Sequence, residues 1–333
     1  MGPAHGESTP VTKDARNEVV RGNPLEFPAV QAWRQLRKRK SRSAIYRLAG
    51  VGPRGSVIAK WCRPATAAVE RAVYEEVLPH LPLTALRCYG SFEEDDGKFC
   101  WLFLEDGGGQ EYSPEREEHR VLAAGWLGLL HTSATRVAAA ARLPDRGPGH
   151  YLDHLRSARA AILGNLTNGA LSAEDRAVLK AIVRQCDALE SRWDQVQRMC
   201  DRMPRTLVHG DFVVKNVNVR PGPAGPAFLA FDWETAGWGV PAPDLVQALL
   251  LDRVSSVSPD LPTYWRAVRD SWPHLSIEDI RRLADLGSVF RLLAMIHWLS
   301  LDLAYPWVSK PMAGMRIYHA ELAQVVRATC REG

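Results

Sequence analysis

Cysteine is scarce and scattered in this sequence, with six among 333 residues. No two cysteines form a CxxC pair, and no group of cysteines and histidines has the spacing of a zinc site. A chain of this length buries a sizeable core without disulfides, so a reducing cytoplasm is the expected compartment. A run of eighteen apolar residues is also lacking, which argues against a membrane-spanning helix. The first residues have no apolar core, so we expect no secretory signal.

An excess of one charge is lacking as well. Lys and Arg total 42, Asp and Glu total 38, and the formal net charge is +4. Residues 1–150 carry 21 basic and 18 acidic side chains, and residues 151–333 carry 21 and 20. Nucleic-acid-binding domains concentrate basic charge, whereas both halves of this chain are nearly balanced. We therefore expect no nucleic-acid partner, and we also expect no membrane partner. The run RKRKSR at 37–42 is predicted to be a solvated face or part of a nucleotide loop.

The first third of the chain has the pattern of a small β-rich unit. Residues 1–24 are polar with interspersed Gly and Pro, which predicts a loose tail. Short apolar and β-branched runs separated by turn sequences predict four strands, with a helix opened by Pro64 and ended by Pro79. These runs are SAIYRLAG, GSVIAKW, ALRCYGSF and KFCWLFLE. An additional strand could precede them, within 25–42.

Helical patterns dominate after the sequence LEDGGG. They cover 114–140, two further helices over 149–200, and the chain after Pro243. A short β island interrupts them at 205–232. The sequence therefore predicts an α+β protein with a β-rich N-lobe over 25–106 and a larger, mostly helical C-lobe over 107–333.

The densest chemical signal is LVHGDFVVKNVNV followed by FLAFDW. Asp211 and Asn216 lie five residues apart on a loop between predicted strands, and Asp232 ends an apolar strand sixteen residues later. Two carboxylates and a carboxamide on adjacent loops form an oxygen-rich site, which suits Mg²⁺ shared with substrate phosphates. His209 follows the first strand, and we expect it to hold the loop through a backbone hydrogen bond.

This pair of motifs resembles the catalytic and metal-binding loops of the aminoglycoside phosphotransferase and choline kinase-like family, which has a bilobal protein-kinase-like fold. The resemblance covers about residues 40–330. It implies that Asp211 positions or deprotonates the attacking hydroxyl, and that Asn216 and Asp232 hold Mg²⁺. Some protein kinases place an arginine at the position of Lys215, which suggests a catalytic role there. A solvent-facing loop lysine is the alternative.

The N-lobe supplies the expected nucleotide-binding residues. Such a fold needs a strand lysine that pairs with the phosphates and with a helix glutamate, and VIAK supplies Lys60. Glu70 flanks the apolar stripe of the following helix, whereas Glu76 lies within it. The sequence ERAVY resembles the family's glutamate followed by an aromatic residue four positions later, so we choose Glu70 as the partner and keep Glu76 as the alternative.

Two parts of the nucleotide site leave weaker signals. The chain has no GxGxxG loop over the phosphates; Ser41, Ser43 or the neighbouring basic residues are the candidates for that contact. The sequence LFLEDGGG resembles the hinge between the lobes, where backbone groups near Glu105 and Gly107 would contact adenine.

The predicted function is phosphorylation of a small-molecule hydroxyl by Mg·ATP, with GTP as the other possible donor. The acceptor is expected to be an antibiotic or another natural product. The alternatives are a metabolic kinase for choline, an amino alcohol or a sugar, and a nucleotide-binding pseudoenzyme. The late helices offer only scattered acids, so we expect an acceptor with at most one charge and a sizeable apolar part. The acids are Asp285, Asp302 and Glu321, among aromatics that include Trp265, Trp298, Tyr305, Trp307 and Tyr318.

Overall fold

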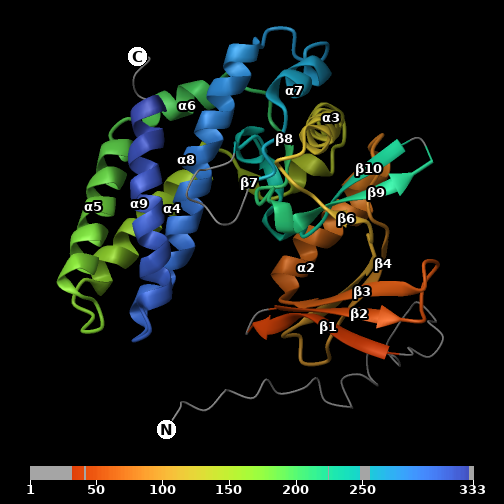
Figure 1. The fold of residues 1–333 in the computed structure, drawn as a ribbon, viewed down its shortest axis with the longest axis horizontal. Coiled ribbons are helices and arrows are strands. Elements are labelled where there is room, and N and C mark those ends of the chain that lie inside the picture. The colour runs from red at the N-terminus through yellow and green to blue at the C-terminus, as the bar shows by residue number, and fades with distance from the viewer. Residues whose placement is uncertain (1–31, 41–42, 224, 248–255, 330–333) are drawn as a thin grey trace.

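The protein is an α+β structure, seen in a computed structural model that describes residues 32–40, 43–223, 225–247 and 256–329 (Figure 1). A β-rich sheet forms the N-terminal part, and helices form most of the C-terminal part, as the sequence predicted. The predicted tail over 1–24 lies outside the described residues, as does Ser41.

The N-terminal part is a five-stranded antiparallel sheet with strand order β1-β2-β3-β5-β4. Burial alternates along β2, as expected for a strand with one face on a core. Helix α2 packs against β4 and β5. It begins with Pro64 in its first turn, where a backbone N–H has no acceptor within the helix, so proline loses no hydrogen bond there. The strands are β1 (Ala32–Lys40), β2 (Ser43–Ala49), β3 (Ser56–Cys62), β4 (Cys88–Glu93) and β5 (Cys100–Glu105), and α2 spans Pro64–Arg71.

The α2 helix continues as a π-helical turn over Ala72–Val77 and a 3₁₀ turn over Leu78–His80. The strand β1 is the additional strand that the sequence left open within 25–42. It pairs with β2 in an irregular register, with shifts between Gln35 and Arg37 and between Arg37 and Lys40.

The C-terminal part contains a group of helices around the apolar helix α8. Ser172 and Ser276 each form a capping box with the aspartate three residues later, which fixes where α5 and α8 begin. Residues 149–200 form three helices rather than the expected two, because a short turn at Ser191 and Arg192 separates α6 from α5. The helices are α3 (Glu117–Ala134), α4 (Pro148–Asn165), α5 (Ala173–Glu190), α6 (Trp193–Asp201), α7 (Leu261–Val268), α8 (Ile277–Leu301) and α9 (Ser309–Thr329).

Two small sheets position the loops that carry the motifs. In one, β8 lies at an edge beside β11, so the chain leaves β8 directly into His209. In the other, β9 and β10 pair so that Val217 lies opposite Ala230, which brings the loops before β9 and after β10 together. The strands are β6 (Gln110–Glu111), β7 (Asp145–Arg146), β8 (Thr206–Val208), β9 (Val217–Gly222), β10 (Gly225–Ala230) and β11 (Gly237–Gly239).

By length and hydropathy alone, the segment Ile277–Ala304, which contains α8, could cross a membrane. Its mean hydropathy is 1.3 over the most apolar window, and 61% of that window is buried inside the protein. The helix packs against α4, α9 and the turn at Ala242–Asp244. Its apolar character therefore fits a core helix of the helical part.

Candidate functional site

The loop after β8 is held by His209 and Gly210. The His209 ring is buried, and its Nε2–H donates to the Phe231 carbonyl at 3.0 Å, which joins this loop to the one that carries Asp232. Gly210 has φ of 76°, and a Cβ at this position would lie 2.7 Å from the Thr235 carbonyl oxygen. Glycine is therefore required here by both conformation and space. The predicted structural role of His209 agrees with these contacts.

Asp244, a residue that the sequence analysis did not single out, anchors the same loop. Its carboxylate is buried and accepts the backbone N–H groups of His209 at 2.7 Å and Gly210 at 2.9 Å. The His131 Nε2–H donates to it at 3.3 Å, and His131 Nδ1 lies 2.9 Å from the Tyr264 hydroxyl. A buried carboxylate with three donors is a stable arrangement, so this network fixes the residues before Asp211. The only sequence signal was an aspartate in PAPDL.

Asp211 lies in a polar environment made by its own loop and by α8. Asn216 Nδ2 donates to the carboxylate and to the carbonyl of Asp211, both at 3.0 Å. Lys215 Nζ lies 3.1 Å from Asp211 Oδ2, and Arg291 Nη1 lies 3.9 Å from Asp211 Oδ1. The structure thus brings Asp211, Lys215 and Asn216 together, and it adds Arg291, which no local motif indicated.

Lys60 lies among three carboxylates at the junction of the two parts. Its Nζ contacts Glu70, Asp232 Oδ1 at 2.5 Å and Glu234 Oε2 at 3.3 Å. Burial acts to lower the pKa of Lys60, but the three carboxylates raise it well above its ordinary value, so the ammonium stays charged. Burial raises the pKa of the fully buried Glu70 to about 7 against the opposing effect of Lys60.

The partner of Lys60 is Glu70, the residue chosen from the sequence. Glu76, the alternative, lies on the surface, where it accepts from Arg142 at 2.8 Å. Glu70 precedes the π-helical turn and faces the sheet, whereas the turn carries Glu76 outward. Glu234 is an additional acid in this group that the sequence analysis did not select.

The side chains beside these loops fit a divalent cation. Asn216 Oδ1 is buried and has no hydrogen-bond partner, so it is an orphaned acceptor. Among the described residues, one group of acids has ligand atoms within 4.8 Å of one another: Glu70, Asp232 and Glu234. Together with Lys60 these carboxylates carry a formal charge of −2. Oxygen ligands with excess negative charge suit Mg²⁺. Asp232 has φ of 70°, an uncommon conformation for an aspartate that places its carboxylate in this group.

A cavity of about 200 Å³ lies between the sheet and the loops after β5 and β10. Its lining includes the charged group of Lys60, Glu70 and Asp232, the segment after β5 and several apolar side chains. The lining residues are Leu36, Ile45, Arg47, Ile58, Lys60, Glu70, Leu86, Leu104, Glu105, Asp106, Gly107, Gly108, Asn218, Phe231 and Asp232. A cavity that combines apolar side chains with a charged group fits a purine and its phosphates.

The hinge predicted at Glu105 and Gly107 lines this cavity, but the Glu105 side chain is engaged elsewhere. Arg220 contacts its carboxylate at 2.7 Å and Arg54 at 3.1 Å. The backbone groups of the hinge are therefore the atoms that could form hydrogen bonds with a nucleotide base. Ser43 begins β2, two residues before Ile45 of the cavity lining, and is not itself among the lining residues.

Asp106, the next residue, also lines the cavity. Its carboxylate accepts from Arg47 Nη2 at 3.1 Å and from Ser56 Oγ at 2.7 Å. These contacts tie β2 and β3 to the hinge. No local pattern indicated these contacts, because Arg47 and Asp106 are 59 residues apart.

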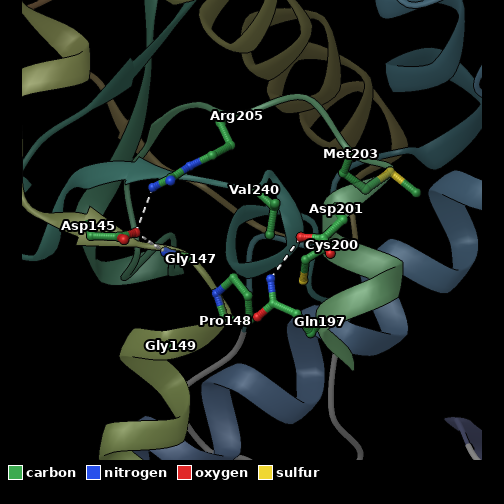
Figure 2. A pocket seen from close by; sticks show the side chains of 10 residues that line it. All are labelled: Asp145, Gly147, Pro148, Gly149, Gln197, Cys200, Asp201, Met203, Arg205 and Val240. Carbon is green, nitrogen blue, oxygen red and sulfur yellow. Dashed lines mark hydrogen bonds and ion pairs between the residues drawn. The ribbon is translucent and has the colours of Figure 1, made fainter. Parts of the chain in front are cut away.

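A second cavity of about 330 Å³ lies at the start of α4 and shares no lining residue with the first (Figure 2). Its polar side chains pair with one another. Arg205 contacts Asp145 at 2.6 Å, and Gln197 Nε2 donates to Asp201 at 2.8 Å. Arg205 also donates to the Trp238 carbonyl at 2.7 Å. Because these polar side chains already bind one another, they offer no evident group for a ligand, and we assign this cavity no function.

The solved structures that resemble this chain include small-molecule kinases and a complex with an antibiotic. The choline kinase of Cryptosporidium parvum Iowa II has a TM-score of 0.63 at 11% identity, over 95% of this chain and 96% of that one. A GDP and kanamycin complex of APH(2")-IIia has a TM-score of 0.62 at 16% identity, over 93% and 99%. A microcompartment-associated aminopropanol kinase has a TM-score of 0.60 at 14% identity, over 90% and 93%. At these identities the likeness shows the fold alone.

The family is decided at the level of sequence. No curated protein sequence matches the chain. The model of the phosphotransferase enzyme family matches residues 33–286, which include the cavity, the loop of Asp211 and the carboxylates around Lys60. The chain therefore belongs to the phosphotransferase enzyme family and is a small-molecule phosphotransferase.

Proposed function

We propose that this phosphotransferase transfers the γ-phosphoryl group of Mg·ATP to a hydroxyl of a small molecule. Residues 25–106 would form the nucleotide-binding lobe, and residues 107–333 the catalytic and acceptor-binding lobe. The observation that carries the proposal is the connection between the Asp211 loop and the cavity. Asn216 contacts Asp211 through its side chain and accepts the backbone N–H of Phe231, a cavity residue, at 3.0 Å.

The proposed reaction is an in-line displacement in which the protein positions charges. The acceptor oxygen forms a bond to the γ-phosphorus, its proton passes to the Asp211 carboxylate, and the bond from the γ-phosphorus to ADP breaks. Lys60, positioned by Glu70, would bind phosphate oxygens, and Lys215 beside Asp211 would contact the transferred group. Asn216 Oδ1 and Asp232 would hold Mg²⁺, which neutralises phosphate charge when bound.

The donor and the acceptor follow from the same site and from its neighbours. ATP is our first candidate, and GTP is the second because similar structures contain GDP. For the acceptor we favour an antibiotic or another natural product. An amino alcohol is the alternative, because the choline kinase and the aminopropanol kinase have TM-scores of 0.63 and 0.60, close to the 0.62 of the kanamycin complex.

The test is ADP release by the purified protein with a panel of antibiotics and amino alcohols, compared with the variant Asp211→Asn. We expect the variant to bind nucleotide normally and to lose about 10²–10⁴-fold in turnover, the typical contribution of a positioned base. The control variant Asp145→Asn makes the same chemical change at an exposed residue of the second cavity. Near-normal turnover by Asp211→Asn would remove Asp211 from the proposed role.

A further inference from the structure

One face of α8 continues from the candidate catalytic site. Arg291 marks this face, because its guanidinium contacts the Asp211 carboxylate. An α-helix turns about 100° per residue, so a residue seven positions further points within about 20° of the same direction. That residue is Trp298, which lies about 10 Å further along the helix axis. The nearest residues of this face between them are Ala294 and Met295, which are apolar.

Trp298 is exposed although it is a large apolar side chain. It retains 39% of its accessible surface, and it belongs to a group of exposed apolar residues at the end of α8. Half of the large exposed hydrophobic side chains among the described residues fall within 298–307. They are Trp298, Leu301, Tyr305 and Trp307, and the last two rings stack at 5.0 Å. Apolar surface concentrated in this way commonly marks a binding site.

The acids that a polycationic acceptor would need are dispersed. Asp285 is exposed, precedes Arg291 by six residues and points about 120° away from it around the helix. Glu321 is 4% exposed within α9. Asp302 is exposed at the end of α8, one turn beyond Trp298 on the same face and about 16 Å from Arg291 along the helix axis. Each bound ammonium needs a nearby carboxylate, and the described part of this α8 face supplies none within two turns of Arg291.

We propose that the α8 face from Arg291 to Trp298 selects acceptors that carry an apolar or aromatic ring about 10 Å from the reacting hydroxyl. The inference rests on the proposed phosphotransfer at Asp211 and adds the acceptor class. Trp298 would stack on that ring, and the hydroxyl would lie at Asp211. Small amino alcohols are too short to reach Trp298, and the described part of the α8 face between Arg291 and Trp298 offers a polycationic aminoglycoside no carboxylate. In Figure 1, α8 runs from beside α7 down along α9, past the loops that carry the site.

The experiment measures steady-state phosphorylation of three acceptor types by the wild-type protein, Trp298→Ala and the control Leu129→Ala. The acceptors are a macrolide with an apolar ring at this distance from a hydroxyl, kanamycin and choline. We expect the macrolide type to be the preferred acceptor. Trp298→Ala should raise its KM about 10-fold, as for the loss of an aromatic stack, with kcat and the KM for ATP unchanged. Leu129→Ala, which truncates an exposed apolar side chain on α3, outside this group, should leave the KM unchanged.

Three results would overturn the inference while the proposed function stood. These are preferred use of kanamycin or choline, an unchanged acceptor KM in Trp298→Ala, and an equal rise in KM in Trp298→Ala and Leu129→Ala. Thermal unfolding of each variant checks that the truncation has not damaged the fold. Phosphorylation of no acceptor, with ADP release equal to that of Asp211→Asn, would contradict the proposed function itself.

Discussion

Replacing Asp244 by asparagine tests whether the buried network behind the catalytic loop positions Asp211. The two carboxylate oxygens accept separate backbone N–H groups, from His209 and from Gly210. The asparagine has one oxygen, and its NH₂ group would face the other N–H, donor to donor. The site is 1% exposed, so water cannot replace the lost acceptor.

The expected effect has two parts. A buried donor left without an acceptor costs about 1–3 kcal/mol of folding free energy. The chain would relieve the donor–donor contact by moving His209 or Gly210, which directly precede Asp211. A misplacement of about 1 Å in a catalytic group can cost about 10²-fold in rate. We therefore expect kcat to fall about 10²-fold. Nucleotide affinity should be retained, because Lys60 lies outside this network.

The assay combines urea unfolding, nucleotide binding and turnover of whichever acceptor the panel identifies. Tyr264→Phe is the matched control, because it removes the hydroxyl beside His131 Nδ1 and leaves every direct contact of Asp244 in place. It should lose less stability and little turnover. If Asp244→Asn kept both its unfolding free energy and its kcat, the network would have no positioning role and the reasoning would be refuted.

Three further predictions follow from other contacts. Asp232→Ala and Asn216→Ala should both raise the Mg²⁺ concentration needed for half-maximal turnover. The increase should be larger for Asp232→Ala because this variant removes a charge. An unchanged Mg²⁺ titration in both variants would place the metal elsewhere. Lys60→Met should lower the melting temperature, because Glu70 stays buried without its counter-ion, and adding Glu70→Met should restore stability but not turnover. Burial lowers the pKa of His154 to about 3, so the folded protein favours the neutral ring. The free energy of unfolding should therefore fall as pH drops below about 6.5, where the ring of the unfolded chain becomes protonated. Urea titrations at pH 7.5 and 5 should show a smaller loss of stability in His154→Phe.

The sequence by itself determined the elements and the local motifs. Short apolar and β-branched runs between turn sequences specified the strands, among them β3, which carries Lys60, because such residues favour a sheet and Gly and Pro favour the turns between strands. The spacing of Asp211 and Asn216 was sufficient to place them together, because five residues of one loop cannot separate far. The class of fold and the oxygen-rich site were predictable for these local reasons.

The tertiary structure decided the contacts between distant parts of the chain. Asp244 joins a loop 34 residues away, and Glu234 lies 174 residues from Lys60, so neither contact has a local pattern. Arg291 reaches Asp211 only because α8 packs where it does. Glu70 was the partner chosen from the sequence, and the structure decided against the alternative Glu76, which lies on the surface in the π-helical turn after α2. Local periodicity constrains which residues are buried, whereas packing determines which buried and polar groups meet.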